Sequence, residues 1–142
     1  MTEIADTIFE TDRVELMSIA VEKRRMHWRL CQICCAFAEG RYEVTYSFAT
    51  GFRIENYRLI VRSDEEAPSI SSIYDSAVFY ENEMHELFGL KIEAMQTDLK
   101  DRLYRIEETT PFLNHLPPTP PKPKAPAPAA SASEIKETKE GK

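Results

Sequence analysis

Two consecutive stretches of alternating side chains constrain the fold of this chain more than any other feature. In residues 41–49 the apolar members of the alternation are Tyr42, Val44, Tyr46 and Phe48, and in residues 54–62 they are Tyr57, Leu59 and Val61. A period of two places every second side chain on the same face of a strand. Because Gly51 interrupts the pattern, we predict two neighbouring antiparallel strands, residues 42–49 and 54–62, joined by a short turn.

A helix is predicted ahead of these strands, over about residues 13–26. Asp12 followed by Glu15 resembles a capping box, which is typical of a helix start. The apolar face of this helix would consist of Val14, Leu16, Met17, Ala20 and Val21, with Ile19 as a further candidate. The next segment, residues 27–40, is apolar on both faces, and we interpret it as a buried strand, although periodicity alone does not exclude a helix.

A second helix is predicted in the stretch FYENEMHELFGLKIE, residues 79–93, which crowds three carboxylates around one histidine. At about 100° per residue, the apolar side chains fall within one arc. They are Ala77, Tyr80, Met84, Leu87 and Phe88. Gly89 is a natural residue to end the helix. Glu83 and Glu86 are expected on the opposite, solvent side of the helix, where they would face water or the interface with a partner protein, whereas Glu81 and His85 border the apolar arc.

These elements predict an α+β fold, a small and mostly antiparallel sheet with helices packed on one face, within a domain of residues 1–116. Residues 97–112 would add a short helix or strand extension. Its packing side chains would be Leu99, Leu103, Tyr104 and Ile106. Seven of the nine prolines lie between Pro117 and Pro128. Such sequence buries too little apolar surface to fold, so residues 117–142 are predicted to form a flexible, disordered tail.

Charge and composition exclude several classes of function. Residues 1–116 carry 13 Lys and Arg against 21 Asp and Glu, and this acidic balance argues against nucleic acid as a partner. No stretch approaches the roughly 20 apolar residues that cross a bilayer, and we expect neither export nor membrane insertion from signals in this sequence. Three cysteines, Cys31, Cys34 and Cys35, are interpreted as reduced cytoplasmic thiols rather than a disulfide framework.

The charged side chains of residues 79–93 are candidates for metal binding and for acid–base chemistry. Glu81 and His85, four residues apart, could hold a metal together with a remote His or Cys, but a site needs at least a third protein ligand. Glu81 and Glu83 could act as general acid and base, yet they point about 160° apart on a helix. We therefore expect Glu81 to tie down a backbone or Arg partner and His85 to bond to Glu81 or solvent.

The cysteine spacing C-x-x-C suggests redox chemistry or an iron–sulfur cluster. Four thiolates are normally needed for a cluster, and this chain has three. On a strand, Cys31 and Cys34 would also face opposite ways. We interpret the cysteines as small, buried apolar residues.

The helical stretch resembles the signature of the 30 kDa subunit of respiratory complex I and of its relatives in membrane-bound [NiFe] hydrogenases. That signature runs E-R-E-x-x-[DE], followed by two apolar residues and commonly Gly. Its matching positions here are Glu81, Glu83, Glu86, Leu87, Phe88 and Gly89. Asn82 stands where the family usually has Arg. The leading helix and the strands before the signature, within residues 10–106, extend the resemblance.

The resemblance implies a non-catalytic structural subunit that binds no metal or other cofactor of its own. It is most similar to the small stand-alone subunit of energy-converting, Ech-type hydrogenases, which are ferredoxin-linked and ion-pumping. The implied partners are a large subunit that holds [NiFe] and further subunits that hold iron–sulfur clusters. The implied location is peripheral, on the cytoplasmic side of the cell membrane, with membrane contact only through partner subunits. Alternatives are the equivalent subunit of a complex I-like NADH or other dehydrogenase, an independent metal-binding protein using Glu81 and His85, and a free-standing interaction module.

Overall fold

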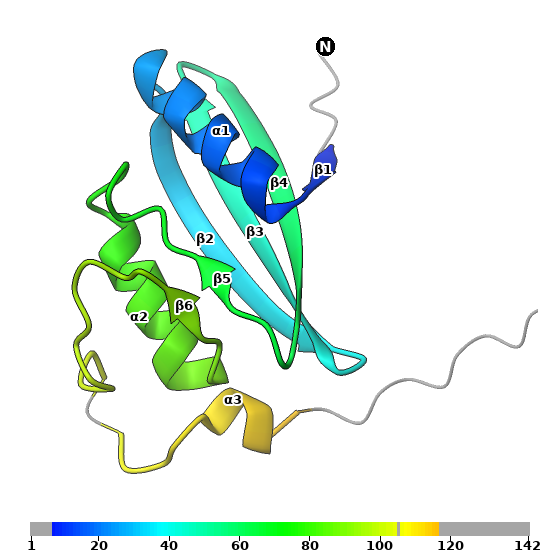
Figure 1. Cartoon of the computed structure of the whole chain (residues 1–142), viewed down its shortest axis with the longest axis vertical. Coiled ribbons are helices and arrows are strands. Elements are labelled where there is room, and N and C mark those ends of the chain that lie inside the picture. Colours follow the sequence, from blue (N-terminus) through cyan, green and yellow to red (C-terminus); the bar gives the residue numbers. More distant parts are fainter. Residues whose placement is uncertain (1–6, 105, 117–142) are drawn as a thin grey trace, which may run out of the picture.

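The computed structural model describes residues 7–104 and 106–116. Its elements are β1 (Ile8–Thr11), α1 (Arg13–Arg25), β2 (Arg29–Ala38), β3 (Arg41–Thr50), β4 (Arg53–Arg62), β5 (Ala67–Pro68), α2 (Ala77–Phe88), β6 (Ile92–Glu93) and α3 (Pro111–Asn114). Four strands form one sheet in the order β1-β4-β3-β2, and β5 pairs with β6. In Figure 1, α1 crosses in front of the sheet and α2 lies beside β2. The predicted α+β class is confirmed.

The sheet is built on the two strands that the alternation predicted. β3 and β4 pair in antiparallel register from Arg41 opposite Arg62 to Thr50 opposite Arg53. β2 pairs antiparallel with β3 through a turn at Glu39 and Gly40, whose φ angles of 52° and 77° are both left-handed. Such turns match the twist of the flanking strands. β1, which the sequence did not reveal, adds to β4 in parallel, so the sheet has four strands rather than about three.

The core lies between the inner face of the sheet and the helices. Its buried residues from β3 and β4 are Tyr42, Val44, Tyr46, Phe48, Leu59 and Val61. The inner face also receives Leu16 of α1 and Met84 of α2, both nearly inaccessible to solvent. Leu16 and Met84 belong to one core cluster with the inner-face residues of β3 and β4, so α1 and α2 cover one side of the sheet, as the sequence predicted.

α1 confirms the predicted start of the first helix. Asp12 caps it, because its Oδ1 accepts the backbone N–H of Glu15 at 2.8 Å. Leu16 is fully buried, but Val14 and Val21 are 78% and 46% exposed. The predicted apolar face was therefore too wide. At about 100° per residue, these two valines point more than ~100° away from the centre of the buried stripe of α1, which Leu16 and Ala20 form against the sheet.

β2 corrects the prediction of a buried strand. The strand exists, but it forms an edge of the four-stranded sheet, and Ile33 is the one buried residue among its ten. Cys34 lies opposite Thr45 on the outer face and is exposed, while Cys31 and Cys35 are half-buried. The interpretation of all three cysteines as buried was therefore wrong. Apolar residues on both faces were interpreted as burial on both faces, although α1 and α2 cover only one.

The segment after β6 corrects a second prediction. The described residues of 97–106 form neither a helix nor a strand. Lys100 and Asp101 both have φ of 54°, a left-handed conformation that a helix or strand does not contain. Leu99 and Leu103 are half-buried, whereas Tyr104 and Ile106 are 41% and 44% exposed and do not pack as expected. A short helix, α3, follows. The predicted tail, residues 117–142, lies outside the described residues and stays a prediction.

Candidate functional site

α2 carries the acidic segment, and its local structure agrees with the pattern. Ala77, Met84 and Leu87 are buried, and the Phe88 carbonyl accepts the hydroxyl proton of Tyr42 at 3.0 Å. The helix ends at Gly89, whose φ of 70° is left-handed and whose N–H donates to the carbonyl of His85. The predicted helix end is confirmed. The carboxylates are therefore held on a rigid element that is fixed on the sheet.

Glu81 is 1% exposed and binds the loop that precedes α2. Its Oε1 accepts the backbone N–H of Ile70 at 2.8 Å, and its Oε2 accepts the hydroxyl proton of Ser69 at 2.7 Å. Burial raises the pKa of Glu81, while the hydrogen bonds from Ser69 and Ile70 oppose that shift. The predicted backbone partner is thus present, and Glu81 fastens residues 69–70 to the helix.

Glu86 corrects the expectation of a solvent-facing carboxylate, because it is only 5% exposed. Its oxygens accept the backbone N–H of Leu103 at 2.9 Å and of Tyr104 at 3.1 Å. The chain after β6 folds back over this side of α2 and buries Glu86. Helix periodicity identified the side that faces away from the sheet, but it could not show that another segment covers that side.

Asn82, to which the sequence analysis assigned no structural role, is 4% exposed and holds the same segment. Its Nδ2 donates to the carbonyl of Thr97 at 2.8 Å and to that of Val78 at 2.7 Å. Its Oδ1 accepts the N–H of Leu99 at 2.8 Å. A polar residue next to a buried Glu within an otherwise amphipathic helix was the available signal. Asn82 and Glu86, one turn apart, together fix residues 97–104 on α2.

The remaining signature residues, Glu83, Leu87 and Phe88, differ in their exposure to solvent and in their contacts. Glu83 is half-exposed, and its charge is the second cause, after desolvation, that raises the pKa of the Tyr104 phenol. Phe88 packs edge-to-face against Phe112 of α3, with ring centroids 5.1 Å apart. Leu87 is buried in the core. Glu83 is thus the signature carboxylate with the most accessible side chain, and its predicted role at an interface stays a prediction.

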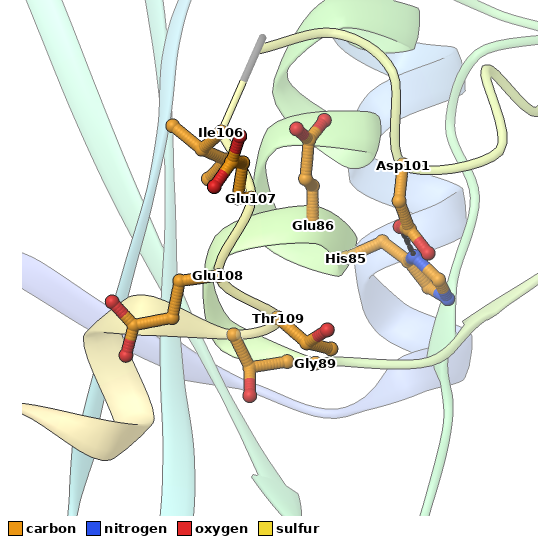
Figure 2. A pocket seen from close by; sticks show the side chains of 9 residues that line it. His85, Glu86, Gly89, Asp101, Ile106, Glu107, Glu108 and Thr109 are labelled. Carbon is orange, nitrogen blue, oxygen red and sulfur yellow. Dashed lines mark hydrogen bonds and ion pairs between the residues drawn. The ribbon is translucent and has the colours of Figure 1, made fainter.

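His85 bonds to Asp101 rather than to Glu81 or solvent, with 2.7 Å between Nδ1 and Oδ1. The pair borders a cavity of about 210 Å³ between α2 and the segment before α3 (Figure 2). The cavity is lined by His85, Glu86, Gly89, Asp101, Ile106, Glu107, Glu108, Thr109 and Thr110. Four of these residues are acidic, so the cavity disfavours anionic ligands.

The geometry does not assemble the metal or acid–base sites that the sequence left open. Glu81 turns to Ser69 and Ile70, whereas His85 turns to Asp101, so the two side chains do not share a partner. Within residues 7–104 and 106–116, no three His, Cys, Asp or Glu side chains are grouped as metal ligands require. Both carboxylate oxygens of Glu81 are engaged in hydrogen bonds inside the core, which leaves no room for proton exchange with a substrate.

Cys35, in the cysteine cluster, lacks the features of a reactive thiol. Burial, and secondly the neighbouring Cys34, raise the pKa of the Cys35 thiol to about 12. Because the thiolate is the nucleophile and the metal ligand, such a thiol is inert at neutral pH. All three cysteines are free.

The fold and these contacts define a class: a small α+β domain whose acidic helix organises its own loops. A family model describing the respiratory-chain NADH dehydrogenase 30 kDa subunit matches residues 7–120. The chain belongs to this family. The coarser part of the sequence resemblance is thereby confirmed.

Two further similarities agree with this assignment. A segment of 54 residues is 35% identical to the C subunit of NADH-quinone oxidoreductase from Bartonella bacilliformis, covering 37% of this chain and 26% of that protein. The match thus spans about a quarter of that relative. The fold is similar to a chain in the structure of the membrane-bound sulfane sulfur reductase, an archaeal respiratory membrane complex. That match has a TM-score of 0.61 at 17% identity and covers 76% of this chain and 68% of the other.

The helices of the described region are all too short or too polar to cross a membrane.

Proposed function

We propose that this chain is a non-catalytic structural and assembly subunit of a membrane-associated oxidoreductase complex of the complex I type. The observation that carries the proposal is that two signature carboxylates bind the backbone of the domain itself. Glu81 and Glu86 are buried and bonded to backbone N–H groups of two different loops. Membership in the 30 kDa subunit family supports the same interpretation. The domain thus presents an ordered surface to other subunits, which would carry the redox chemistry.

Within this class we propose an Ech-type membrane-bound [NiFe] hydrogenase, ferredoxin-linked and ion-pumping. The chain would dock on the large catalytic subunit and on iron–sulfur subunits at the cytoplasmic side of the membrane. The support for this branch is the similarity of the compact domain predicted for residues 1–116 to the small stand-alone subunit of such enzymes. The [NiFe] centre and the iron–sulfur clusters would belong to the partner subunits.

The second candidate is the equivalent subunit of a complex I-like NADH or other dehydrogenase. It is favoured by the local identity to a protein named as the C subunit of NADH-quinone oxidoreductase. Both candidates assign the same scaffolding role to this chain, and they differ in the metal content of the large partner subunit.

Affinity purification of the full-length tagged chain from its native membranes, after mild detergent, tests the proposal. Recovery of a large subunit with nickel and iron supports the hydrogenase branch, and iron–sulfur subunits with NADH-oxidising activity but without nickel support the dehydrogenase branch. Membranes from cells with the untagged protein serve as the control. Recovery of the tagged chain alone, from membranes in which it is stable, would contradict the scaffolding role itself.

A further inference from the structure

Four exposed arginines gather at one corner of the domain, where α1 ends and the β3–β4 turn lies. They are Arg24, Arg25, Arg29 and Arg53, which we name the arginine corner. Arg53 lies 5.6 Å from the centroid of the Trp28 ring, and the Trp28 backbone N–H donates to the carbonyl of Lys23 in the last turn of α1. Both the end of α1 and the β3–β4 turn lie at the top of Figure 1.

The β-sheet register brings the start of β2 to the same place. Arg29 lies opposite Ala49, and Ala49 lies opposite Ile54. Arg29 is therefore one strand away from the turn that carries Phe52 and Arg53. The arginine corner thus combines residues from α1, β2 and β4, which are separated by up to 29 positions of sequence.

Exposed apolar side chains neighbour these arginines in the sequence. Phe52, at the tip of the β3–β4 turn, is fully exposed, while Ile54 and Met26 are 60% and 53% exposed. A tight turn is normally filled by polar residues or glycine, so an exposed phenylalanine contributes nothing to forming it. Exposed aromatic, methionine and arginine side chains together are the composition enriched where proteins bind one another.

Arg53 is paired with Glu55, but the charges of the other three arginines of the corner are not neutralised within residues 7–104 and 106–116. Arg24, Arg25 and Arg29 form no ion pair with any residue that the structure describes, although acids outnumber bases in residues 1–116. Glu55, a carboxylate in this corner, is already bonded to Lys23 and Tyr57 as well as to Arg53. The negative C-terminal end of the α1 dipole explains why cations such as Arg24 and Arg25 are favourable there. It does not explain the arginines on β2 and β4.

We propose that the arginine corner, with Phe52 at its centre, is a docking surface for an acidic segment of a partner polypeptide. Arg24, Arg25 and Arg29 would each bind a carboxylate, and Phe52 would enter an apolar recess on the partner. The inference rests on the proposed function, because it assumes a complex, and it deepens that function by assigning one surface and the chemistry of what binds there.

A protein partner fits these residues better than an anionic membrane. The unpaired cations of the corner, Arg24, Arg25 and Arg29, are all arginines, whose planar guanidinium groups bind carboxylates through two parallel hydrogen bonds. A membrane surface attracts each basic residue by only about 1 kcal/mol, so three cations give weak attachment without further anchors. Carboxylates on a partner protein, partly removed from water at an interface, bind the arginines more strongly and more selectively than an anionic membrane surface does.

The test compares two full-length triple variants with the wild-type chain, each purified from native membranes. Arg24→Gln/Arg25→Gln/Arg29→Gln neutralises the corner. Lys91→Gln/Lys100→Gln/Arg102→Gln is the matched control, because it removes the same charge at three exposed cations that form no ion pair with a described residue. The expected result is a loss of about tenfold or more in partner recovery for the corner variant alone.

Equal recovery with the corner variant and wild type would overturn the docking surface while leaving the proposed function intact. Equal loss with both triples would also overturn it, because the effect would then follow net charge. Thermal melting of each variant separates docking from folding. Recovery of wild type without any partner would contradict both proposals at once.

A photo-crosslinking benzophenone amino acid in place of Phe52 identifies the occupant directly. The expected product joins position 52 to a partner peptide rich in Asp and Glu. Crosslinking to lipid would overturn the proposal and point to a membrane. So would binding of the wild-type chain, but not of the corner variant, to phosphatidylglycerol vesicles while partner recovery from membranes stays unchanged.

Discussion

Glu81 accepts a hydrogen bond from the backbone N–H of Ile70 at 2.8 Å, and both residues are almost completely buried. This contact joins α2 to the loop before it, deep in the domain. It gives Glu81 of the acidic signature the structural role that the sequence predicted, since this carboxylate holds two segments of the chain together.

Replacing Glu81 by Ala should lower the free energy of unfolding by about 1–3 kcal/mol, because it leaves the buried Ile70 N–H without its partner and removes the acceptor of the Ser69 hydroxyl, which keeps only Ser71. Glu86→Ala is the matched comparison. It should cost less, about 1 kcal/mol, because Leu103 and Tyr104 lie closer to water and can be rehydrated. Urea unfolding of both variants checks the order. A larger loss from Glu86→Ala would show that the 97–104 segment matters more than the buried loop.

Glu81 should also give the domain a characteristic dependence on pH. Its folded pKa is raised above the ordinary value of 4.5, chiefly by burial, so the folded state retains this proton more strongly than the unfolded chain. The contribution to stability is complete below pH 4.5 and is lost as pH rises through the folded pKa. The difference in unfolding free energy, wild type minus Glu81→Gln, should therefore fall with rising pH. A difference that stays constant or rises would contradict this assignment.

Lys23 and Glu55 form an ion pair under the exposed arginines, with Lys23 only 8% exposed and 3.9 Å above the Trp28 ring. The hydrogen bond from Lys23 is the largest cause that lowers the pKa of Glu55. The stability from this lowered pKa is present at neutral pH and is lost as pH falls through the folded pKa. Lys23→Met should cost about 2–3 kcal/mol at neutral pH. Chemical unfolding at neutral and acidic pH checks this, and an equal cost at both would argue against the pair.

Gly89→Ala should destabilise the end of α2 through both conformation and contact. The left-handed φ of 70° costs a residue with a side chain about 1–2 kcal/mol, and the new Cβ would lie 3.0 Å from Cγ2 of Thr110. Gly40→Ala is the control, since its φ is 77° but nothing lies within 4 Å. Thermal melting should show a larger loss for Gly89→Ala. Equal losses would mean that Thr110 moves aside freely.

Deletion of residues 117–142 should leave the domain folded, because the core and the loop contacts of α2 lie within residues 7–104 and 106–116. The cooperativity and midpoint of thermal unfolding should match those of the full chain. Loss of a cooperative transition in the truncated chain would show that the predicted tail belongs to the folded unit.

Local sequence determined two of the strands and one end of each of the helices α1 and α2, because these features depend on neighbouring residues. Alternation predicted β3 and β4, Asp12 predicted the start of α1, and Gly89 predicted the end of α2. These features arise from side-chain periodicity and from caps a few positions away, so the chain specifies them without knowledge of distant segments.

Tertiary structure decided what periodicity cannot express, namely which segment covers each surface. The parallel pairing of β1, the edge position of β2 and the burial of Glu86 depend on chain segments far away in sequence. The residues that bury Glu86 lie 17 and 18 positions later, and no local pattern encodes that return. A helix fixes the direction of its side chains, but only the folded chain determines whether water or another backbone meets them.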